Sequence, residues 1–222
     1  MDLEIRLNWQ TRAEAGGRIP PCAGLWFAAG PFRVAYPGGR STVLAAGVSA
    51  DLRATVRGFD PGRSGSRAGR VRADNPLLAA VLADGQPPVR WSLLALPTLS
   101  ASAVDAVAVA VLEVFVRRHG VLPYGCERAP VSGLDAVWEG GVRLIEPTTA
   151  EPGPVLDAPA LARRYGLECA IRDPVAGALA LTLGESPEAS GDVELVRRDS
   201  GLDWPAVRFV VPPPPPSPRR GA

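Results

Sequence analysis

The sequence predicts an α+β fold in which a mostly antiparallel sheet accompanies one main helix. Short β-type runs alternate with glycine and proline turn signals in the first 60 residues and again in the last third of the chain. One long helical pattern, over residues 102–118, lies between these two regions. Runs of strands with few intervening helices are typical of an α+β domain.

The N-terminal region is expected to consist mainly of strands. The predicted strands are Leu3 to Trp9, Pro31 to Tyr36, Thr42 to Ala46 and Leu52 to Val56. The sequence Tyr36-Pro37-Gly38-Gly39-Arg40 predicts a turn between the second and the third of them, because glycine and proline favour tight turns.

A change of composition follows, since residues 58–74 are rich in glycine, serine and arginine. Few apolar residues anchor this segment, so it is predicted to be a mobile loop. Guanidinium groups bind phosphate oxygens through two hydrogen bonds at once, and glycine lets the backbone approach a ligand closely. The loop is therefore a candidate for binding phosphate or nucleic acid, against the alternative of a solvated surface loop. The candidate anion-binding residues are Arg63, Arg67, Arg70 and Arg72.

The middle of the chain contains the clearest helix. Residues 76–82 predict a short helix that begins with proline, and residues 89–96 predict a buried strand. Ser102 and Asp105 have capping-box spacing at the start of the main helix, which is predicted over residues 102–118. Its valines also alternate as in a strand, but its length and its caps favour a helix.

The rest of the chain is predicted to form a strand, three hairpins, a short helix and a tail. The strand covers residues 121–126, the helix covers residues 160–165, and the hairpins pair 134–138 with 142–145, 168–172 with 178–183, and 193–197 with 206–211. Residues 1–211 are expected to be a single domain. The proline-rich residues 212–222 are expected to be a disordered tail with polyproline II character.

The chain contains no lysine, since all 24 basic residues are arginine. Arginine is always protonated, so Schiff-base and other nucleophilic lysine chemistry is excluded, as is a Walker A phosphate loop. The one histidine, His119, excludes metal sites that need two histidines. The three cysteines, Cys22, Cys126 and Cys169, are too widely spaced for a CxxC site. We therefore predict no metal site and no cofactor.

His119 follows two arginines at the predicted end of the main helix. The helix dipole favours a cation there, so a capping histidine is the simpler interpretation and a catalytic histidine is the alternative. The net charge of the chain is +1, and no signal peptide or membrane span is visible. We expect a soluble cytoplasmic protein with no membrane partner, which acts with a protein partner or, through its arginine loop, with nucleic acid. No pattern in the sequence indicates the oligomeric state.

Two segments form a pattern when they are considered together. The first is Gly38-Gly39-Arg40 followed by Val43-Leu44. The second is residues 126–145, in which a cysteine, an Ala-Pro-Val-Ser turn, an acidic strand start at Asp135 and a Gly-Gly-Val-Arg hairpin follow one another. In this order the segments resemble the biotin/lipoate (octanoyl) protein ligases and transferases. The resemblance spans about 110 residues.

The resemblance implies a ligand site and a nucleophile. It places Gly38, Gly39 and Arg40 along an acyl or acyl-adenylate pocket, together with Asp135 and Arg143. Arg143 would occupy the region of the family's lysine, and Cys126 would hold the place of the transferase's nucleophile. A structural role for Cys126 is the alternative, because buried free cysteines are common.

The chain departs from the family's pattern where catalysis takes place. The lysine that contacts the acyl carbonyl and the adenylate is missing, and Glu146-Pro147-Thr148 replaces the Gly-Ser-Ala that follows it. We therefore expect a non-catalytic or catalytically degenerate domain that acts by binding or assembly. Acyl transfer through Cys126 and anion binding by the arginine loop are the alternatives.

Overall fold

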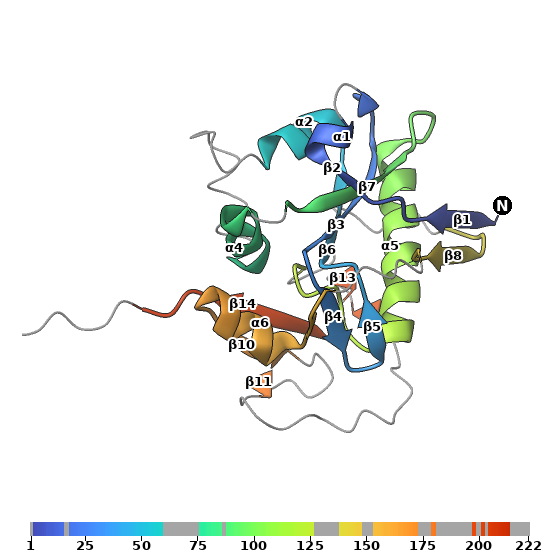
Figure 1. Cartoon of the computed structure of the whole chain (residues 1–222). Coiled ribbons are helices and arrows are strands. Elements are labelled where there is room, and N and C mark those ends of the chain that lie inside the picture. The colour runs from blue at the N-terminus through green and yellow to red at the C-terminus, as the bar shows by residue number, and fades with distance from the viewer. Residues whose placement is uncertain are drawn as a thin grey trace, which may run out of the picture.

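A computed structural model describes residues 2–15, 18–59, 76–85, 88–126, 138–147, 153–172, 179–180, 197–198, 201–202 and 204–213. Its fold is α+β with mostly antiparallel strand pairing, as the sequence predicts. A four-stranded antiparallel sheet with the order β2-β7-β3-β6 forms the centre (Figure 1). Its strands are β2 (Gln10–Thr11), β3 (Gly24–Ala29), β6 (Ala45–Ser49) and β7 (Arg90–Ala95).

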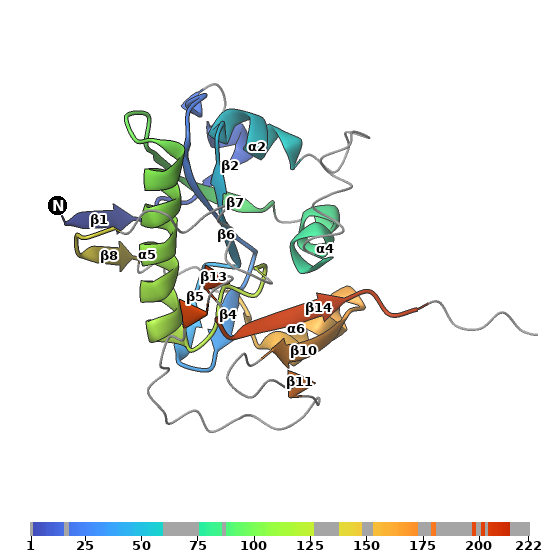
Figure 2. The same ribbon diagram turned by 180° about the vertical axis from the view of Figure 1, so that it is seen from behind.

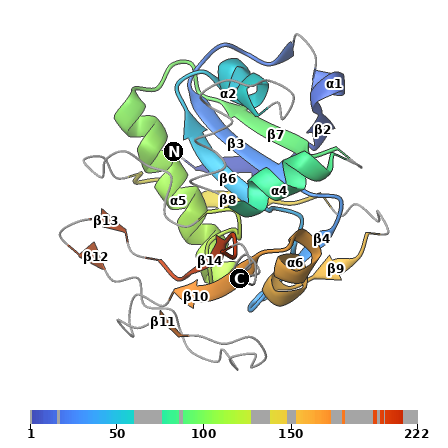
Figure 3. The same ribbon diagram turned by 90° about the vertical axis from the view of Figure 1, so that its left-hand side faces the viewer.

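Helices lie on both faces of the central sheet. The long helix α5 (Ala101–His119) runs along one face, and α2 (Leu52–Gly58) and α4 (Pro76–Asp84) lie on the other, as Figure 3 shows. The short helix α1 (Arg12–Ala15) follows β2 directly. β3 is an inner strand, in which Phe27 pairs with Ala46 of β6 and with Ser92 of β7.

Smaller sheets surround this centre, and Figure 2 shows them from behind. β4 (Arg33–Tyr36) pairs antiparallel with β5 (Gly39–Ser41) and parallel with β9 (Val155–Leu156). β1 (Leu3–Arg6) and β8 (Val142–Ile145) form a parallel pair. β10 (Glu168–Arg172) lies between β11 (Leu179–Ala180) and β14 (Ala206–Val210), while β12 (Arg197–Arg198) pairs with β13 (Gly201–Leu202). The last helix is α6 (Ala158–Tyr165).

One cluster of buried side chains connects these parts. It runs from the central sheet through α5 to α6 and β14. Its largest fully buried apolar members are Phe27, Phe115, Phe209, Leu44, Leu52, Leu77, Leu78, Leu122 and Leu161. Burying large side chains of this kind is the dominant favourable contribution to folding.

The main helix is confirmed, but it begins earlier than its capping-box spacing suggests. The N-cap is Ser100, whose Oγ accepts a hydrogen bond of 3.3 Å from the backbone N–H of Ala103. The helix ends at Gly120, which has a φ of 81° and whose N–H donates to the carbonyl of Val116. A left-handed residue at this position is a common helix stop, and glycine adopts it without steric cost.

Two predicted strands are wrong. Residues 52–56 belong to α2, because the carboxylate of Asp51 accepts a hydrogen bond from the N–H of Ala54 and caps a helix there. Residues 121–126 follow α5 as a turn rather than a strand. The strand predicted over residues 42–46 is shifted to β6, and the strand predicted from residue 3 ends at Arg6.

Two predicted pairings involve partner strands that lie almost wholly outside the described residues. β8 pairs in parallel with β1, while the partner predicted for it, residues 134–138, lies outside the described residues except for Trp138. β14 pairs with β10, while the partner predicted for it, residues 193–197, is described only at Arg197, which pairs with Leu202 of β13. The predicted hairpin between residues 168–172 and 178–183 is confirmed where it is described, as the pair β10 and β11.

Several predictions concern residues that are not described. The predicted loop over residues 58–74 is described only at Gly58 and Phe59, which end α2, and the predicted tail only at residues 212–213. In the part of the chain that the structure covers, none of the helices combines the length and the apolar character that crossing a bilayer requires.

Candidate functional site: the hairpin junction

Three segments that are far apart in the sequence meet along the β4–β5 hairpin, and we call this place the hairpin junction. The hairpin contacts the C-terminal end of α5, where the N–H of Gly38 donates a hydrogen bond of 3.1 Å to the carbonyl of His119 (Figure 1). A Cβ atom at Gly38 would lie 2.5 Å from the carbonyl oxygen of Arg118. Only glycine therefore permits this close approach between hairpin and helix.

Glu146 brings the third segment to the junction, since it directly follows β8. Its carboxylate accepts hydrogen bonds of 2.8 Å from Ser41 Oγ and from the backbone N–H of Thr42, and one of 3.0 Å from Thr42 Oγ1. Burial would raise the pKa of Glu146, but the His119 ring and the donors on Thr42 and Ser41 outweigh burial and hold the pKa below its usual value. The carboxylate is therefore ionised at neutral pH and links the end of β8 to the end of β5.

His119 lies at the centre of the junction and is only 1% exposed. Its Nε2 atom is 3.7 Å from Oε1 of Glu146, and neither ring nitrogen has a hydrogen-bond partner among the described residues. The rings of Phe115 and Tyr36 flank the imidazole, with centroid separations of 4.3 and 5.3 Å. The prediction that this histidine ends the main helix is confirmed, but its ring is directed into the core towards Glu146.

The junction contains serine, histidine and glutamate without the order that nucleophilic catalysis needs. In a catalytic triad the histidine lies between the nucleophile and the carboxylate. Here Ser41 and His119 both approach the carboxylate of Glu146, and Ser41 donates to both of its oxygens. The arrangement stabilises three chain segments, and it leaves Ser41 bonded directly to the carboxylate, without a histidine between them to accept its proton.

Cys126 is buried next to the edge of the central sheet. Its thiol donates a hydrogen bond of 3.2 Å to the carbonyl of Ala46 and accepts one of 3.3 Å from the N–H of the same residue. The N–H of the neighbouring Gly125 donates to the carbonyl of Leu44. Gly125 and Cys126 therefore hydrogen-bond to the backbone at the start of β6, on its outer edge, much as a neighbouring strand would. Burial raises the pKa of the Cys126 thiol to about 12, so the thiolate that a nucleophile requires is strongly disfavoured.

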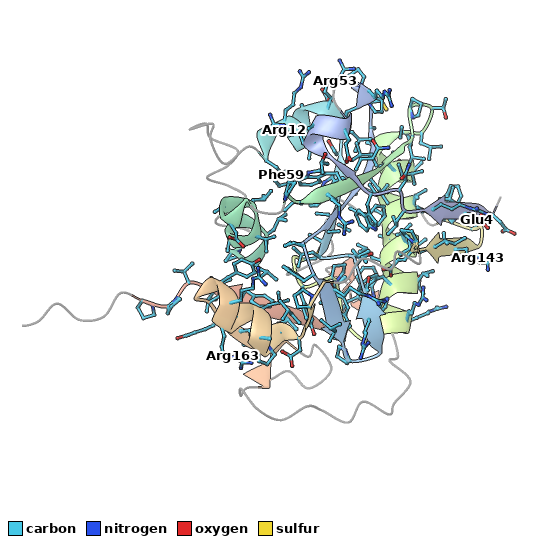
Figure 4. The ribbon with its side chains drawn as sticks, in the orientation of Figure 1. Glu4, Arg12, Arg53, Phe59, Arg143 and Arg163 are labelled. Atoms are coloured by element: carbon cyan, nitrogen blue, oxygen red, sulfur yellow. The ribbon has the colours of Figure 1, made fainter. Side chains whose placement is uncertain are left out.

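The predicted ligand-site residues are brought together only in part. Gly38, Gly39 and Arg40 form the hairpin tip and are exposed. Arg143 lies on β8, whose far end reaches the junction, but its side chain is exposed and lies 3.9 Å from Glu4 at the outer margin of the molecule (Figure 4). Asp135 and the four arginines of the predicted anion site lie outside the described residues.

Sequence reasoning did not identify the residues that hold the junction together, which are Ser41, Thr42, His119 and Glu146 as a group. Glu146 is 105 residues from Ser41 in the sequence, and no local spacing connects them. Within the described ranges, no group of three or more His, Cys, Asp or Glu residues is arranged to hold a metal ion. No protein-family model, no curated protein and no solved structure matches the chain.

Proposed function

We propose that this protein is a non-catalytic or catalytically degenerate domain, related in shape to the biotin/lipoate ligases, that acts by binding or assembly. The observation that carries the proposal is the link between the Gly38 hairpin and the end of β8. These two segments carry the family resemblance, and the carboxylate of Glu146 joins them through Ser41 and Thr42. The resemblance requires them to be neighbours in space.

The same link supports the absence of ligase activity. An acyl-adenylate carries a negative phosphate, and the family resemblance implies a lysine to contact it. This chain has no lysine, and the ionised Glu146 lies at the base of the hairpin. Two like charges near each other in a partly buried site repel strongly. The junction is therefore unsuited to holding an adenylate.

The ligand we propose is a neutral acyl group, such as a lipoyl or octanoyl chain attached through an amide to a protein partner. An amide carries no charge that Glu146 would repel. The exposed guanidinium of Arg40, at the hairpin tip, offers hydrogen-bond donors to its carbonyl. Hydrogen bonds from Gly38 to α5 and from Ser41 and Thr42 to Glu146 fix the hairpin in place, and such preorganisation lowers the entropic cost of binding.

A titration monitored by amide NMR tests this function, with octanamide and lipoamide as probes. We expect the amide signals of Gly38, Gly39 and Arg40 to shift with either probe, and to shift less with a non-hydrolysable octanoyl-adenylate analogue. Exchange of pyrophosphate into ATP in the presence of octanoate should stay at the blank rate. Measurable exchange of pyrophosphate into ATP would contradict the proposal. Amide signals of Gly38, Gly39 and Arg40 that do not move at the highest octanamide concentration would contradict it as well.

The alternative of acyl transfer through Cys126 has a separate test. Iodoacetamide should label Cys126 in the folded protein much more slowly than Cys22 and Cys169, which are partly exposed. Labelling of Cys126 ahead of the other two cysteines would favour the transferase instead. Replacing Cys126 with serine provides the control that assigns the labelled site.

A further inference from the structure

Among the described residues, the strand β1 is hydrogen-bonded along one edge only, and we call its other edge the free edge. The N–H groups of Leu3 and Leu7 donate to carbonyls of the segment containing β8, at 2.8 and 2.9 Å. Backbone groups of successive residues point to opposite sides of a strand. The N–H and C=O groups of Glu4 and Arg6 therefore point away from β8, and no other described strand pairs with that side.

The two residues whose backbone groups point to this free edge have exposed side chains of opposite charge. The side chains of Glu4 and Arg6 are 42% and 77% exposed, and Nε of Arg6 lies 2.8 Å from Oε1 of Glu4. Ile5, between them, is buried in the core. In Figures 1 and 2, β1 and β8 project beyond α5 at the margin of the molecule, with the N-terminus at their outer end. The edge thus combines a fixed backbone with exposed charged side chains.

We propose that the β1 edge is a homodimer interface, in which two copies of β1 pair antiparallel about a twofold axis through Ile5. Such pairing would join two β8-β1 pairs into one four-stranded sheet. This inference is independent of the proposed function, because it concerns a different part of the surface. Closed twofold symmetry is the commonest arrangement of protein dimers, and adding a strand to an exposed sheet edge is a recurrent mode of recognition.

The backbone and the charges select the same register. With the axis at Ile5, Glu4 of one copy lies opposite Arg6 of the other, and both residues present outward N–H and C=O groups. Each such pair exchanges two hydrogen bonds, as in an antiparallel ladder. Axes through Glu4 or through Arg6 would instead place like charges opposite each other, which is destabilising.

A second copy fits this edge better than an unrelated strand would. Charged side chains normally protect an exposed edge against pairing. Here Glu4 and Arg6 carry opposite charges two residues apart. In an antiparallel pair of copies, Glu4 of each copy therefore faces Arg6 of the other. The contact is short, and interfaces of small area are weak and transient. We therefore expect a dimer that forms at high concentration and weakens as salt is added.

Charge reversal at the edge provides the test, with sedimentation velocity as the measurement over micromolar to millimolar concentrations. Arg6→Glu creates an edge with two acidic residues, and Glu4→Arg creates one with two basic residues. Each variant alone should dimerise at least about tenfold more weakly than the native protein, because like charges then face each other. An equimolar mixture of the two variants should form a heterodimer, since every facing pair is complementary again.

Arg163→Glu is the matched control, because Arg163 is also exposed but lies on α6, away from β1 (Figure 4). It makes the same change of charge and should leave dimerisation unchanged. Thermal unfolding checks that each variant folds, and hydrogen exchange of the native chain should show concentration-dependent protection of the Glu4 and Arg6 amides. A monomeric native protein at every concentration, a dimer that Arg6→Glu does not weaken, or a mixture that stays monomeric would overturn the proposal.

Discussion

The hairpin junction and the β1 edge both contain a glutamate next to a basic side chain, but water reaches them differently. At the junction, Glu146 is largely buried, is close to His119 and accepts hydrogen bonds from Ser41 and Thr42. At the edge, the pair of Glu4 and Arg6 is shorter, at 2.8 Å, yet both side chains remain exposed. An exposed ion pair contributes about 0–1 kcal/mol to stability, whereas leaving a buried hydrogen-bond donor without its acceptor costs about 1–3 kcal/mol. The distance between the charged atoms therefore does not determine how much each interaction contributes to the free energy of unfolding. The junction stabilises the fold, while the edge is suited to recognition.

The largest expected effect follows from Glu146→Ala. This change leaves the hydroxyls of Ser41 and Thr42 and the N–H of Thr42 without their acceptor in a buried site. We expect the free energy of unfolding, measured with urea, to fall by about 3–5 kcal/mol, because three donors lose their acceptor at once. Glu146→Gln keeps the shape and one acceptor oxygen and should cost less. If Glu146→Ala lowered the free energy of unfolding no more than an ordinary surface substitution does, the contrast between the two regions would be wrong.

A smaller effect is expected at Cys126. Cys126→Ala removes the group that satisfies both the N–H and the carbonyl of Ala46, so two buried backbone groups lose their partner. The expected loss of unfolding free energy is about 1–3 kcal/mol. Cys126→Ser retains a donor and an acceptor and should be milder. If alanine and serine were equally tolerated, the hydrogen bonds of the thiol would not matter for stability.

The pH dependence of stability distinguishes the two regions next. The pKa of Glu146 is lowered in the folded protein from an ordinary value of 4.5, so its contribution is fully present above pH 4.5 and is lost as the pH falls through the folded pKa. The native protein should therefore lose stability more steeply below pH 4.5 than the Glu146→Gln variant does. Urea unfolding at a series of acidic pH values gives both curves. Parallel curves would show that Glu146 is not held in its ionised form by the fold.

The smallest effect on stability is expected for Arg6→Glu. Because the side chain of Arg6 is exposed, the free energy of unfolding of the monomer should change by no more than about 0.5 kcal/mol. The same substitution is expected to weaken dimerisation clearly. A large loss of monomer stability would mean that the β1 edge stabilises the fold as the junction does, and would contradict the contrast between the two regions.

The parts of the fold that local signals determine could be predicted from the sequence. The 102–118 helix, the hairpin turn at Gly38 and the short helix ending at Tyr165 all carry caps, turn residues or clear periodicity. β3 was missed, because its Gly-Leu-Trp-Phe-Ala-Ala sequence is apolar throughout and shows no alternation. The strand predicted over residues 52–56 failed because a single capping residue, Asp51, determines a helix.

The candidate site could be predicted only at the residues that a motif contains. Gly38 was identified because its glycine pair marks a turn, and the structure adds that the helix end also requires glycine there. Glu146 and His119 were not identified as partners, since tertiary packing brings them together and no spacing in the sequence encodes their contact. The parallel pairing of β1 with β8 was missed for the same reason.

A double-mutant cycle between Ser41 and Glu146 tests most directly whether the hairpin and the end of β8 form one junction. The free energies of unfolding of Ser41→Ala, Glu146→Gln and the double variant are compared with that of the native protein. The structure predicts a coupling energy of about 1 kcal/mol or more, as expected for residues that share a partly buried hydrogen bond. Strictly additive losses would show that the two side chains do not interact, and would contradict the junction on which the proposed function depends.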